Sequence, residues 1–262
     1  MKHRVVTLVA FASMTAFSTA TQAAILFTGN FSQNFNTLQN TPNVDANAAT
    51  APTWTNNSTL AGWYGGGTAT LAAGYGVGNG SDNTMLANNT TAVASFGTTA
   101  DSDRAFAPLK RNNSAFIAVA LTNSTANAMN SFAVTYTGEQ WRDNANATSE
   151  LLFTYQVNPT DITSGTWTSI AALNFTGPKN TNTGILDGNA AANRTAGINS
   201  GLTGLTLNPG QTVWLRWQFS GNNGSYVAVD DLTVTANVIP EPASLVLASL
   251  GGLLMLPRRR RA

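Results

Sequence analysis

Two adjacent aspartates near the end of the chain are the residues best suited to bind a metal ion. Asp230 and Asp231 lie within a strand-like segment, residues 226–235. Because successive side chains of a strand point to opposite faces, one carboxylate is expected to face the interior or a neighbouring loop. A buried carboxylate needs a cation or hydrogen-bond donors, and hard oxygen ligands on loops suit Ca²⁺. The pair is a candidate for a structural Ca²⁺ site; the interpretation that we prefer is that these carboxylates cap loop amides or pair with Arg142 or Arg216.

Few residues of the chain are suited to catalysis. The sole histidine, His3, lies in a segment that reads as a cleaved leader, and there is no cysteine. Ser-His-Asp or Cys-His catalysis and His-based metal sites are therefore not expected in residues 24–237. The remaining enzymatic alternative is a glycoside hydrolase with paired carboxylates, for which Glu139 and Glu150 are the candidates. We favour a protein that is not an enzyme, and no cofactor other than Ca²⁺ is predicted.

Four aromatic residues are candidates for a carbohydrate-binding surface. Exposed aromatic rings can stack on sugar rings, with a few polar groups around them to fix the ligand. The candidates for such a platform are Trp63, Tyr64, Trp141 and Trp214. The alternation within residues 211–219 predicts that Trp214 faces outward and Trp217 faces the core. Packing of the tryptophans in the core is the alternative, and it is the interpretation that we prefer.

Alternating apolar residues and turn residues predict an all-β body. Between residues 24 and 237 no stretch keeps an apolar period of 3.6 without Gly, Asn or a β-branched run, so no helix is expected. Turn clusters separate the apolar segments, as in an antiparallel sandwich. The predicted strands are Ala115–Leu121, Ser131–Thr137, Leu151–Val157, Thr166–Leu173, Gln211–Phe219 and Tyr226–Thr235, with Ile25–Phe31 as an edge strand and residues 62–80 as a glycine-rich loop over the sandwich. We therefore predict a single antiparallel β-sandwich, jelly-roll-like, with long Asn- and Gly-rich loops.

The charge of the body argues against nucleic-acid binding. Seven of the 13 basic and eleven of the 12 acidic residues lie in residues 24–237, which gives this segment a formal charge of −4. A nucleic-acid surface needs clustered Lys and Arg to neutralise phosphates, and none is present. Asp101 and Asp103 form a further acidic cluster in this segment. With no cysteine, its stability must come from the core of one domain.

The N-terminal residues 1–23 have the layout of a secretory signal peptide. Lys2 and Arg4 precede an apolar run, residues 5–17, which is too short to span a bilayer. Small residues follow, and cleavage is expected after Ala23 or one residue later. The pattern predicts an N-terminal signal helix and export from the cytoplasm.

The C-terminal residues 238–262 combine a proline motif, a short apolar run and a basic end. Residues 243–256 form an apolar run that as a helix of ~1.5 Å per residue would fall short of a ~30 Å hydrocarbon core. The arginines that follow resist translocation, which leaves the body outside the cytoplasm. The residues of this expected sorting signal are Pro240, Glu241, Pro242, Arg258, Arg259, Arg260 and Arg261.

This combination resembles the PEP-CTERM sorting signal of Gram-negative bacteria. The Pro-Glu-Pro motif of residues 240–242, the short apolar transmembrane helix and the arginine cluster occur in the same order and at the same place. The resemblance implies an exosortase as the processing partner, which would cut near residues 240–242. It also implies transient anchoring in the inner membrane, followed by delivery to the envelope or to an extracellular polymer such as exopolysaccharide.

A second resemblance covers Ser131–Thr235 and concerns the fold. Four short motifs look like recurring motifs of bacterial secreted β-sandwich domains: residues 136–142, 186–190, 213–217 and 228–232. This resemblance implies fold and location, and no activity. Within the first motif, Glu139, Trp141 and Arg142 are expected to be structural, with Arg142 paired to a carboxylate. The sequence thus predicts an exported, non-enzymatic surface or matrix protein, with a carbohydrate-binding module as the alternative and a glycoside hydrolase as a remote one.

Overall fold

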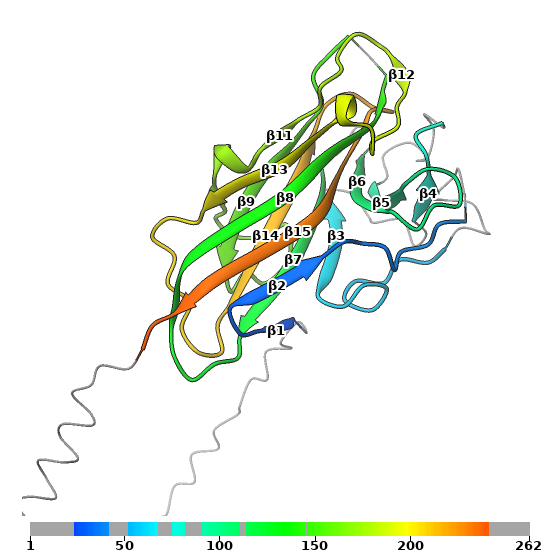
Figure 1. The fold of residues 1–262 in the computed structure, drawn as a ribbon. Coiled ribbons are helices and arrows are strands. Elements are labelled where there is room, and N and C mark those ends of the chain that lie inside the picture. The colour runs from blue at the N-terminus through cyan, green and yellow to red at the C-terminus, as the bar shows by residue number, and fades with distance from the viewer. Residues whose placement is uncertain are drawn as a thin grey trace, which may run out of the picture.

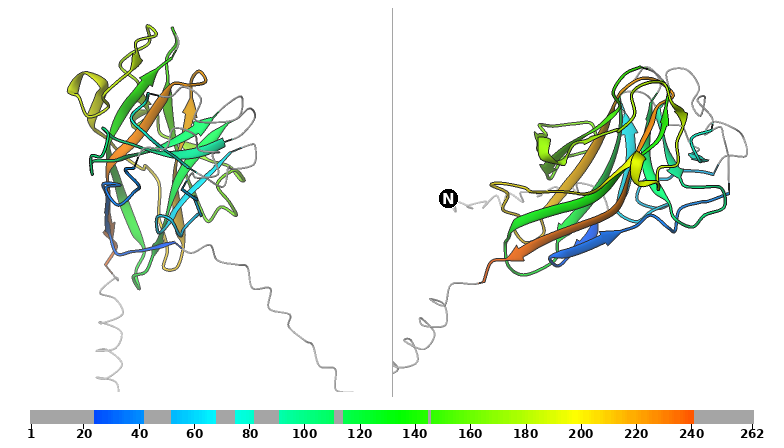
Figure 2. Two further views of the ribbon diagram at one scale, coloured as in Figure 1. Left: turned by 90° about the vertical axis from the view of Figure 1, so that its right-hand side faces the viewer. Right: turned by 45° about the horizontal axis from the view of Figure 1, so that its top comes forward.

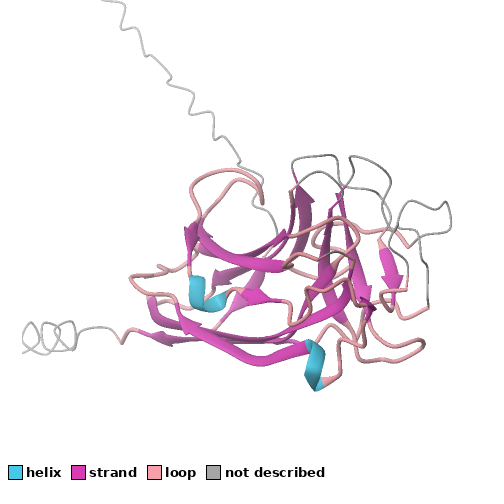
Figure 3. Ribbon diagram, turned by 90° about the horizontal axis from the view of Figure 1, so that it is seen from above, coloured by secondary structure: helices cyan, strands magenta, loops and turns pink. Residues whose placement is uncertain are grey.

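The structure, a computed structural model, describes residues 24–41, 52–67, 75–81, 91–110, 114–144 and 146–240. In these ranges the chain is all-β, as predicted, and its two sheets face one another (Figure 3). The helical elements among the described residues are two 3₁₀ turns, η1 (Ala171–Leu173) and η2 (Ala191–Asn193). The predicted signal helix and transmembrane helix lie outside the described residues. Within those residues, none of the helical turns has the length and apolar character needed to cross a membrane.

The first sheet has seven strands, with β14 at its centre between β7 and β9 (Figure 1). Most pairs are antiparallel, and β1 runs parallel to β7. Its strands are β1 (Ile25–Phe27), β3 (Trp63–Gly67), β7 (Ala115–Asn123), β9 (Glu150–Val157), β10 (Thr168–Ser169), β11 (Phe175–Thr176) and β14 (Thr212–Ser220).

The second sheet has eight strands and is built around the long pair of β8 and β15. It is also mostly antiparallel, with β4 parallel to β5. Its strands are β2 (Asn30–Gln33), β4 (Gly76–Gly78), β5 (Thr91–Phe96), β6 (Ala105–Lys110), β8 (Met129–Asp143), β12 (Gly184–Ile185), β13 (Arg194–Gly201) and β15 (Tyr226–Val238). The parallel pairs make both sheets mixed, although the sandwich is otherwise antiparallel as predicted.

The core between the sheets is built around one tryptophan. Trp217 on β14 is fully buried and contacts the rings of Trp63, Tyr136 and Phe153 at centroid distances of 6.1, 5.6 and 5.3 Å. The hydroxyl of Tyr136 donates a 2.6 Å hydrogen bond to the carbonyl of Leu173, so its polar end is satisfied inside the core. The alternation predicted for residues 211–219 is confirmed, because Trp217 and its inward neighbours belong to this core.

The glycine-rich segment is more regular than predicted. Residues 63–67 form strand β3 against β7, and residues 76–78 form β4 against β5. A Cβ atom on Gly65 would lie 2.4 Å from Val93, and one on Gly66 would lie 2.5 Å from Ile162. These glycines therefore allow β3 to pack closely against the second sheet and against the loop between β9 and β10, whereas the sequence pattern predicted an irregular loop.

The predicted edge strand at residues 25–31 is in fact two strands. β1 pairs with β7 in the first sheet, and β2 pairs with β15 in the second. Gly29, between them, has φ 114, a conformation that side chains rarely adopt. The chain bends at this glycine and passes from one sheet to the other.

Different structural elements lie at the two ends of the sandwich. β12 and η2 lie at one end, and the described chain leaves β15 at the opposite end (Figures 1 and 2). The described chain also starts at β1, near that opposite end (Figure 1). The described chain thus begins and ends at the end of the sandwich away from β12.

Candidate functional site

A β-bulge in β15 sets the positions of the two adjacent aspartates. Between Asp230 and Thr233 the register of β15 against β8 shifts by one residue, and Asp231 has φ 48. Val229 and Leu232 both face the core. The two residues between them therefore both lie on the outer face of the second sheet. The expectation that the aspartates point to opposite faces is wrong, because the bulge interrupts the alternation.

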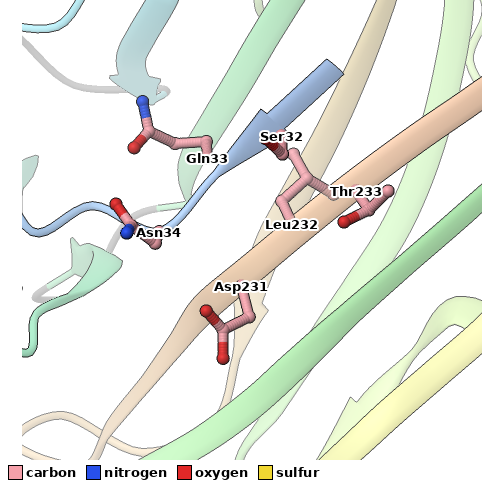
Figure 4. A pocket seen from close by; sticks show the side chains of 6 residues that line it. All are labelled: Ser32, Gln33, Asn34, Asp231, Leu232 and Thr233. Carbon is pink, nitrogen blue, oxygen red and sulfur yellow. The ribbon is translucent and has the colours of Figure 1, made fainter. Parts of the chain in front are cut away.

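The two aspartates differ in exposure. The side chain of Asp230 is 4% exposed, whereas Asp231 is exposed to solvent. Asp231 lines a surface pocket of about 250 Å³ between β2 and β15 (Figure 4). The described residues that line this pocket, which we call the β2–β15 pocket, are Ser32, Gln33, Asn34, Asp231, Leu232 and Thr233.

The outward side chains of the β2–β15 pocket all carry oxygen. Thr233 pairs in register with Ser32, and β2 ends one residue later at Gln33. Asn34 consequently follows the end of β2 on the side of Asp231, and Figure 4 shows these two side chains beside the same opening. The amide oxygen of Gln33 is occupied, because it accepts a 2.8 Å hydrogen bond from the backbone of the loop that follows. The amide oxygen of Asn34 likewise accepts a hydrogen bond, of 3.3 Å, from the backbone amide of Asn36. The pocket therefore presents the carboxylate of Asp231 and the hydroxyl groups of Ser32 and Thr233.

A buried glutamate lies on the neighbouring strand of the same face. Glu139 on β8 is 1% exposed, and its Oε2 accepts a 3.0 Å hydrogen bond from Nε1 of Trp141. Its other oxygen, Oε1, is buried with no hydrogen-bond partner. Burial raises the pKa of Glu139 to about 7, with smaller contributions from Asp103 and Asp231. Arg194 on β13 pairs in register with Glu139 and lowers this pKa.

Asp230 has a similar environment. Its Oδ1 is buried without a hydrogen-bond partner, and burial, followed by the charge of Glu139, raises its pKa to about 8. The charges of Asp231 and Asp103 raise it further, while a hydrogen bond from the backbone of Asp231 lowers it. Burial and Asp231 also raise the pKa of Asp103. Asp103, Glu139, Asp230 and Asp231 thus act on one another electrostatically, and we call them the acidic group.

Arginine does not neutralise the acidic group in the way the sequence suggested. Arg142 donates to the carbonyls of Gly80 at 2.8 Å and Ser81 at 3.2 Å, and to the side chain of Asn144 at 3.5 Å. Arg216 lies on β14 in the other sheet. Within the described residues, the predicted carboxylate partner of Arg142 is therefore wrong, and neither arginine pairs with Asp230. The described residues contain no group of three Asp, Glu, His or Cys side chains placed to hold a metal ion.

The predicted aromatic platform is wrong, and core packing is confirmed. Trp63, Tyr64, Trp141 and Trp214 are all buried, at 0, 5, 1 and 2% exposure. Trp141 stacks on Phe96 at 6.1 Å, and the rings of Tyr64 and Trp214 are 4.4 Å apart.

Trp214 faces outward from the sandwich and is nevertheless covered. Ile162, from the loop between β9 and β10, belongs to the same buried cluster, and Trp167 packs against that cluster. The alternating pattern of residues 211–219 correctly predicted that Trp214 faces away from the core between the sheets. It contained no information on the loop that covers this face.

The two candidate catalytic glutamates lie on different sheets. Glu139 belongs to β8 of the second sheet and Glu150 to β9 of the first. Glu150 accepts a 3.1 Å hydrogen bond from the hydroxyl of Thr176 on the adjacent strand. The structure does not bring these carboxylates together as an acid–base pair.

The chain becomes exposed where the predicted sorting signal begins. Within the described residues, the last hydrogen bond from this end of the chain to the body is donated by the amide of Ile239 to the carbonyl of Ala128 at 2.8 Å. Val238 and Ile239 are each 37% exposed, and Pro240 is exposed. Glu241, Pro242 and Arg258–Arg261 lie outside the described residues.

Comparisons with known proteins give only distant similarities. No protein-family model matches the sequence, and no curated protein is significantly similar to it. Among solved structures, TmCBM61 in complex with β-1,4-galactotriose is 10% identical, with a TM-score of 0.33 over 67% of this chain and 88% of that one. The Agl-KA catalytic domain is 18% identical, with a TM-score of 0.33 over 78% of this chain and 31% of that one.

A third similar structure is the enzymatically active domain of tailspike protein 4 of bacteriophage CBA120. It is 8% identical, with a TM-score of 0.31 over 74% of this chain and 22% of that one. TM-scores below 0.5 do not establish a common fold. The ligands and activities of these three proteins are therefore no guide to this chain.

Proposed function

We propose that this chain is an exported, non-enzymatic β-sandwich of the cell surface or extracellular matrix. In this proposal residues 1–23 direct export and residues 238–262 direct sorting. The observation that carries it is the exposed exit of the chain from β15 at Ile239 and Pro240, directly before Glu241 and Pro242. A processing enzyme needs an accessible backbone, and at this point the chain has left the sheet.

An exosortase is the processing partner in this proposal, and the inner membrane is a transient one. The resemblance of residues 238–262 to the PEP-CTERM signal supports this. The described chain ends just after β15, at the end of the sandwich away from β12 (Figure 1). A body attached there would present the β12 end outward.

The test is cell fractionation of the full chain and of two variants in a host that has an exosortase. One variant lacks residues 243–262, which leaves β15 intact, and the other carries Glu241→Ala. We expect the full chain in the envelope or polymer fraction, the truncated chain elsewhere, and the Glu241→Ala variant retained uncut in the inner membrane. Identical distribution of all three would contradict the proposal.

A carbohydrate-binding module remains the second candidate function. The observation that favours it is the β2–β15 pocket, because Asn34, Asp231 and Thr233 carry groups that can bind sugar hydroxyls. The buried aromatic residues no longer support it. A pull-down on exopolysaccharide with the wild-type chain and with Asp231→Asn tests this carbohydrate-binding function. If the polysaccharide does not retain the wild-type chain, the second candidate function is wrong.

A further inference from the structure

We propose that the end of the sandwich away from β12 rests on a lipid bilayer while residues 243–256 are inserted in that bilayer. This end carries the exposed side chains of Leu26, Val238 and Ile239, and we call it the uncharged end. The inference rests on the proposed function, because it requires the tail to be held in the inner membrane before processing. It adds a contact between the body and the lipid headgroups, which insertion of the tail alone does not require.

The described segments that form the uncharged end contain no charged residue. Asp, Glu, Lys, Arg and His are absent from residues 24–33, 120–136, 153–160, 198–213 and 232–240. The whole chain is 10% charged, so several charged residues would be expected in segments of this combined length. The opposite end differs, because Gly184 and Ile185 of β12 pair in register with Asp143 and Arg142. The charges of the described body are therefore kept away from the end at which the tail begins.

A short connection joins the exposed apolar residues into one surface. Residues 124–128 link β7 to β8 at the uncharged end. The amide of Ser124 donates a 3.1 Å hydrogen bond to the carbonyl of Phe27, and the amide of Ile239 donates one of 2.8 Å to the carbonyl of Ala128. Leu26, which is 74% exposed, and Ile239 thus border the same connection from different sheets. Figure 1 shows the start of the described chain and the end of β15 on this side of the sandwich.

The side chain of Asn123 fixes the loops of the uncharged end. It is 1% exposed, and its Nδ2 donates 2.8 Å hydrogen bonds to the carbonyls of Asn127 and Leu207. Its Oδ1 accepts hydrogen bonds from the amide and the hydroxyl of Thr125, at 3.0 and 2.8 Å. These backbone groups are paired within the protein, so the surface can lie against an interface that is poor in water without leaving them unsatisfied.

The linker between the body and the tail is too short to hold the body far from the membrane. Within the described residues the last hydrogen bond to the body is made by Ile239, and the apolar run begins at residue 243. Four residues span at most ~14 Å, of which the headgroup layer takes about 5–8 Å. The uncharged end consequently lies within about one Debye length, ~8 Å, of the headgroups. A charged side chain placed there would lose hydration, whereas Leu26 would gain from burial in the interface.

The test measures contact between the uncharged end and lipid headgroups. The chain has no cysteine, so a single cysteine can carry a fluorophore. The full chain, recovered uncut from the inner membrane of an exporting host without an exosortase, is reconstituted in vesicles of phosphatidylethanolamine and phosphatidylglycerol. Some of these lipids carry a nitroxide on the headgroup. We expect the nitroxide to quench a fluorophore at Ala126→Cys, an exposed position of the connection, and to leave one at Ile185→Cys, 56% exposed at the opposite end, unquenched.

A charge at Leu26 should push the body away from the membrane. In the Ala126→Cys chain, Leu26→Glu should lower the ratio of docked to undocked bodies about tenfold or more, because the burial of one leucine is lost. Ile185→Glu is the matched control and should leave the quenching unchanged. Equal quenching with and without Leu26→Glu would overturn the proposal.

The remaining outcomes separate this inference from the proposed function. If the chain floats with the vesicles and the label at residue 126 stays unquenched, the docking is wrong and the transient anchoring stands. If the uncut chain does not float with the vesicles, residues 243–256 do not insert, and both are wrong. If exopolysaccharide changes the fluorescence of this label and vesicles do not, the uncharged end binds polymer, and docking on a bilayer is wrong.

Discussion

The indole Nε1 of Trp141 donates a 3.0 Å hydrogen bond to Oε2 of Glu139, and each side chain is only 1% exposed. Both residues lie on β8 and face outward from the sandwich. This bond is the one hydrogen bond that the described residues give the carboxylate, because its other oxygen has no partner. Trp141 therefore takes part both in the aromatic packing of the outer face, through Phe96, and in the environment of the acidic group, through its hydrogen bond to Glu139.

Replacing Trp141 by Phe should destabilise the protein through this hydrogen bond. Phe retains an aromatic ring beside Phe96 and removes the indole donor to Oε2 of Glu139. Leaving a buried acceptor unsatisfied costs about 1–3 kcal/mol, so the free energy of unfolding should fall by about that amount. Denaturant titration measures it. The control is Trp167→Phe, whose Nε1 bonds the carbonyl of Ser164 in a partly exposed loop. An equal loss in both variants would show that ring size alone matters.

The acidic group should make the protein less stable as the pH rises towards 8. The pKa of Glu139 is raised from 4.5 to about 7, and that of Asp230 from 3.8 to about 8. At a pH between the ordinary and the raised pKa values, Glu139 and Asp230 keep their protons in the folded chain, whereas in the unfolded chain they have lost them. The stabilisation is therefore complete below about pH 4 and is lost as the pH rises through 7 and 8.

Thermal melting in the presence of a chelator tests this pH dependence. We expect the contribution of Glu139 to disappear in Glu139→Gln, which should give a flatter profile between pH 5 and pH 8. Asp187→Asn is the control and should keep the wild-type slope. The charged groups that act on Glu139 from the neighbouring elements are Asp103, Arg194 and Asp231. A wild-type profile as flat as that of Glu139→Gln would contradict the assignment.

Gly188 should tolerate no side chain. A Cβ atom at this position would lie 2.3 Å from Cε2 and 2.4 Å from Nε1 of the Trp141 indole. Because Trp141 is buried, the ring can move only by disturbing its bond to Glu139. Gly188→Ala should therefore lower the free energy of unfolding by about 1–3 kcal/mol.

The matched control for Gly188 is Gly201→Ala. Its Cβ would meet the carbonyl of Phe132 at 3.4 Å, an ordinary contact. Differential scanning calorimetry should show a clear drop in melting temperature for Gly188→Ala and a smaller one for Gly201→Ala. If Gly188→Ala melts at the wild-type temperature, the loop that contains Gly188 does not pack against Trp141 as described.

The strands were predictable from sequence because their signal is local. Residues 115–121, 151–157 and 211–219 each carry an apolar pattern of period two or a continuous apolar run, and each became a strand. The bulge at Asp231 was not predictable, since an extra residue in a strand leaves an unchanged run of apolar and polar letters on either side. Val229 and Leu232 are separated by two residues, whereas strict alternation would place one or three between them. This spacing indicates a bulge only once both side chains are known to face the core.

The candidate pocket depended on contacts that are distant in sequence. Asn34 and Asp231 come together because β2 pairs with β15, and no local pattern specifies that register. The aromatic platform failed for the same reason. Trp214 faces outward as predicted, and Ile162 from a separate loop covers that face.

Arg216 should hold that covering loop in place. Its guanidinium lies 3.8 Å from the ring centre of Trp167 and 4.5 Å from that of Phe116. It also donates to the hydroxyl of Thr154 at 3.1 Å and to the carbonyl of Ile162 at 2.8 Å. Burial lowers its pKa only to about 10, so it stays charged at neutral pH. Lysine keeps the charge and lacks the planar group that makes these contacts together.

Arg216→Lys should therefore loosen the loop and expose the outer face of the first sheet. A desolvated cation–π contact is worth about 2 kcal/mol, and we expect a loss of stability of that order. Acrylamide should quench tryptophan fluorescence more strongly in the variant, because Trp167 and Trp214 lose their cover. Arg194→Lys, at an exposed position on the other sheet, should leave both measurements unchanged. If quenching in Arg216→Lys equals that of the wild type, the loop is held by Ile162 and its apolar neighbours, and the aromatic face stays closed without the arginine.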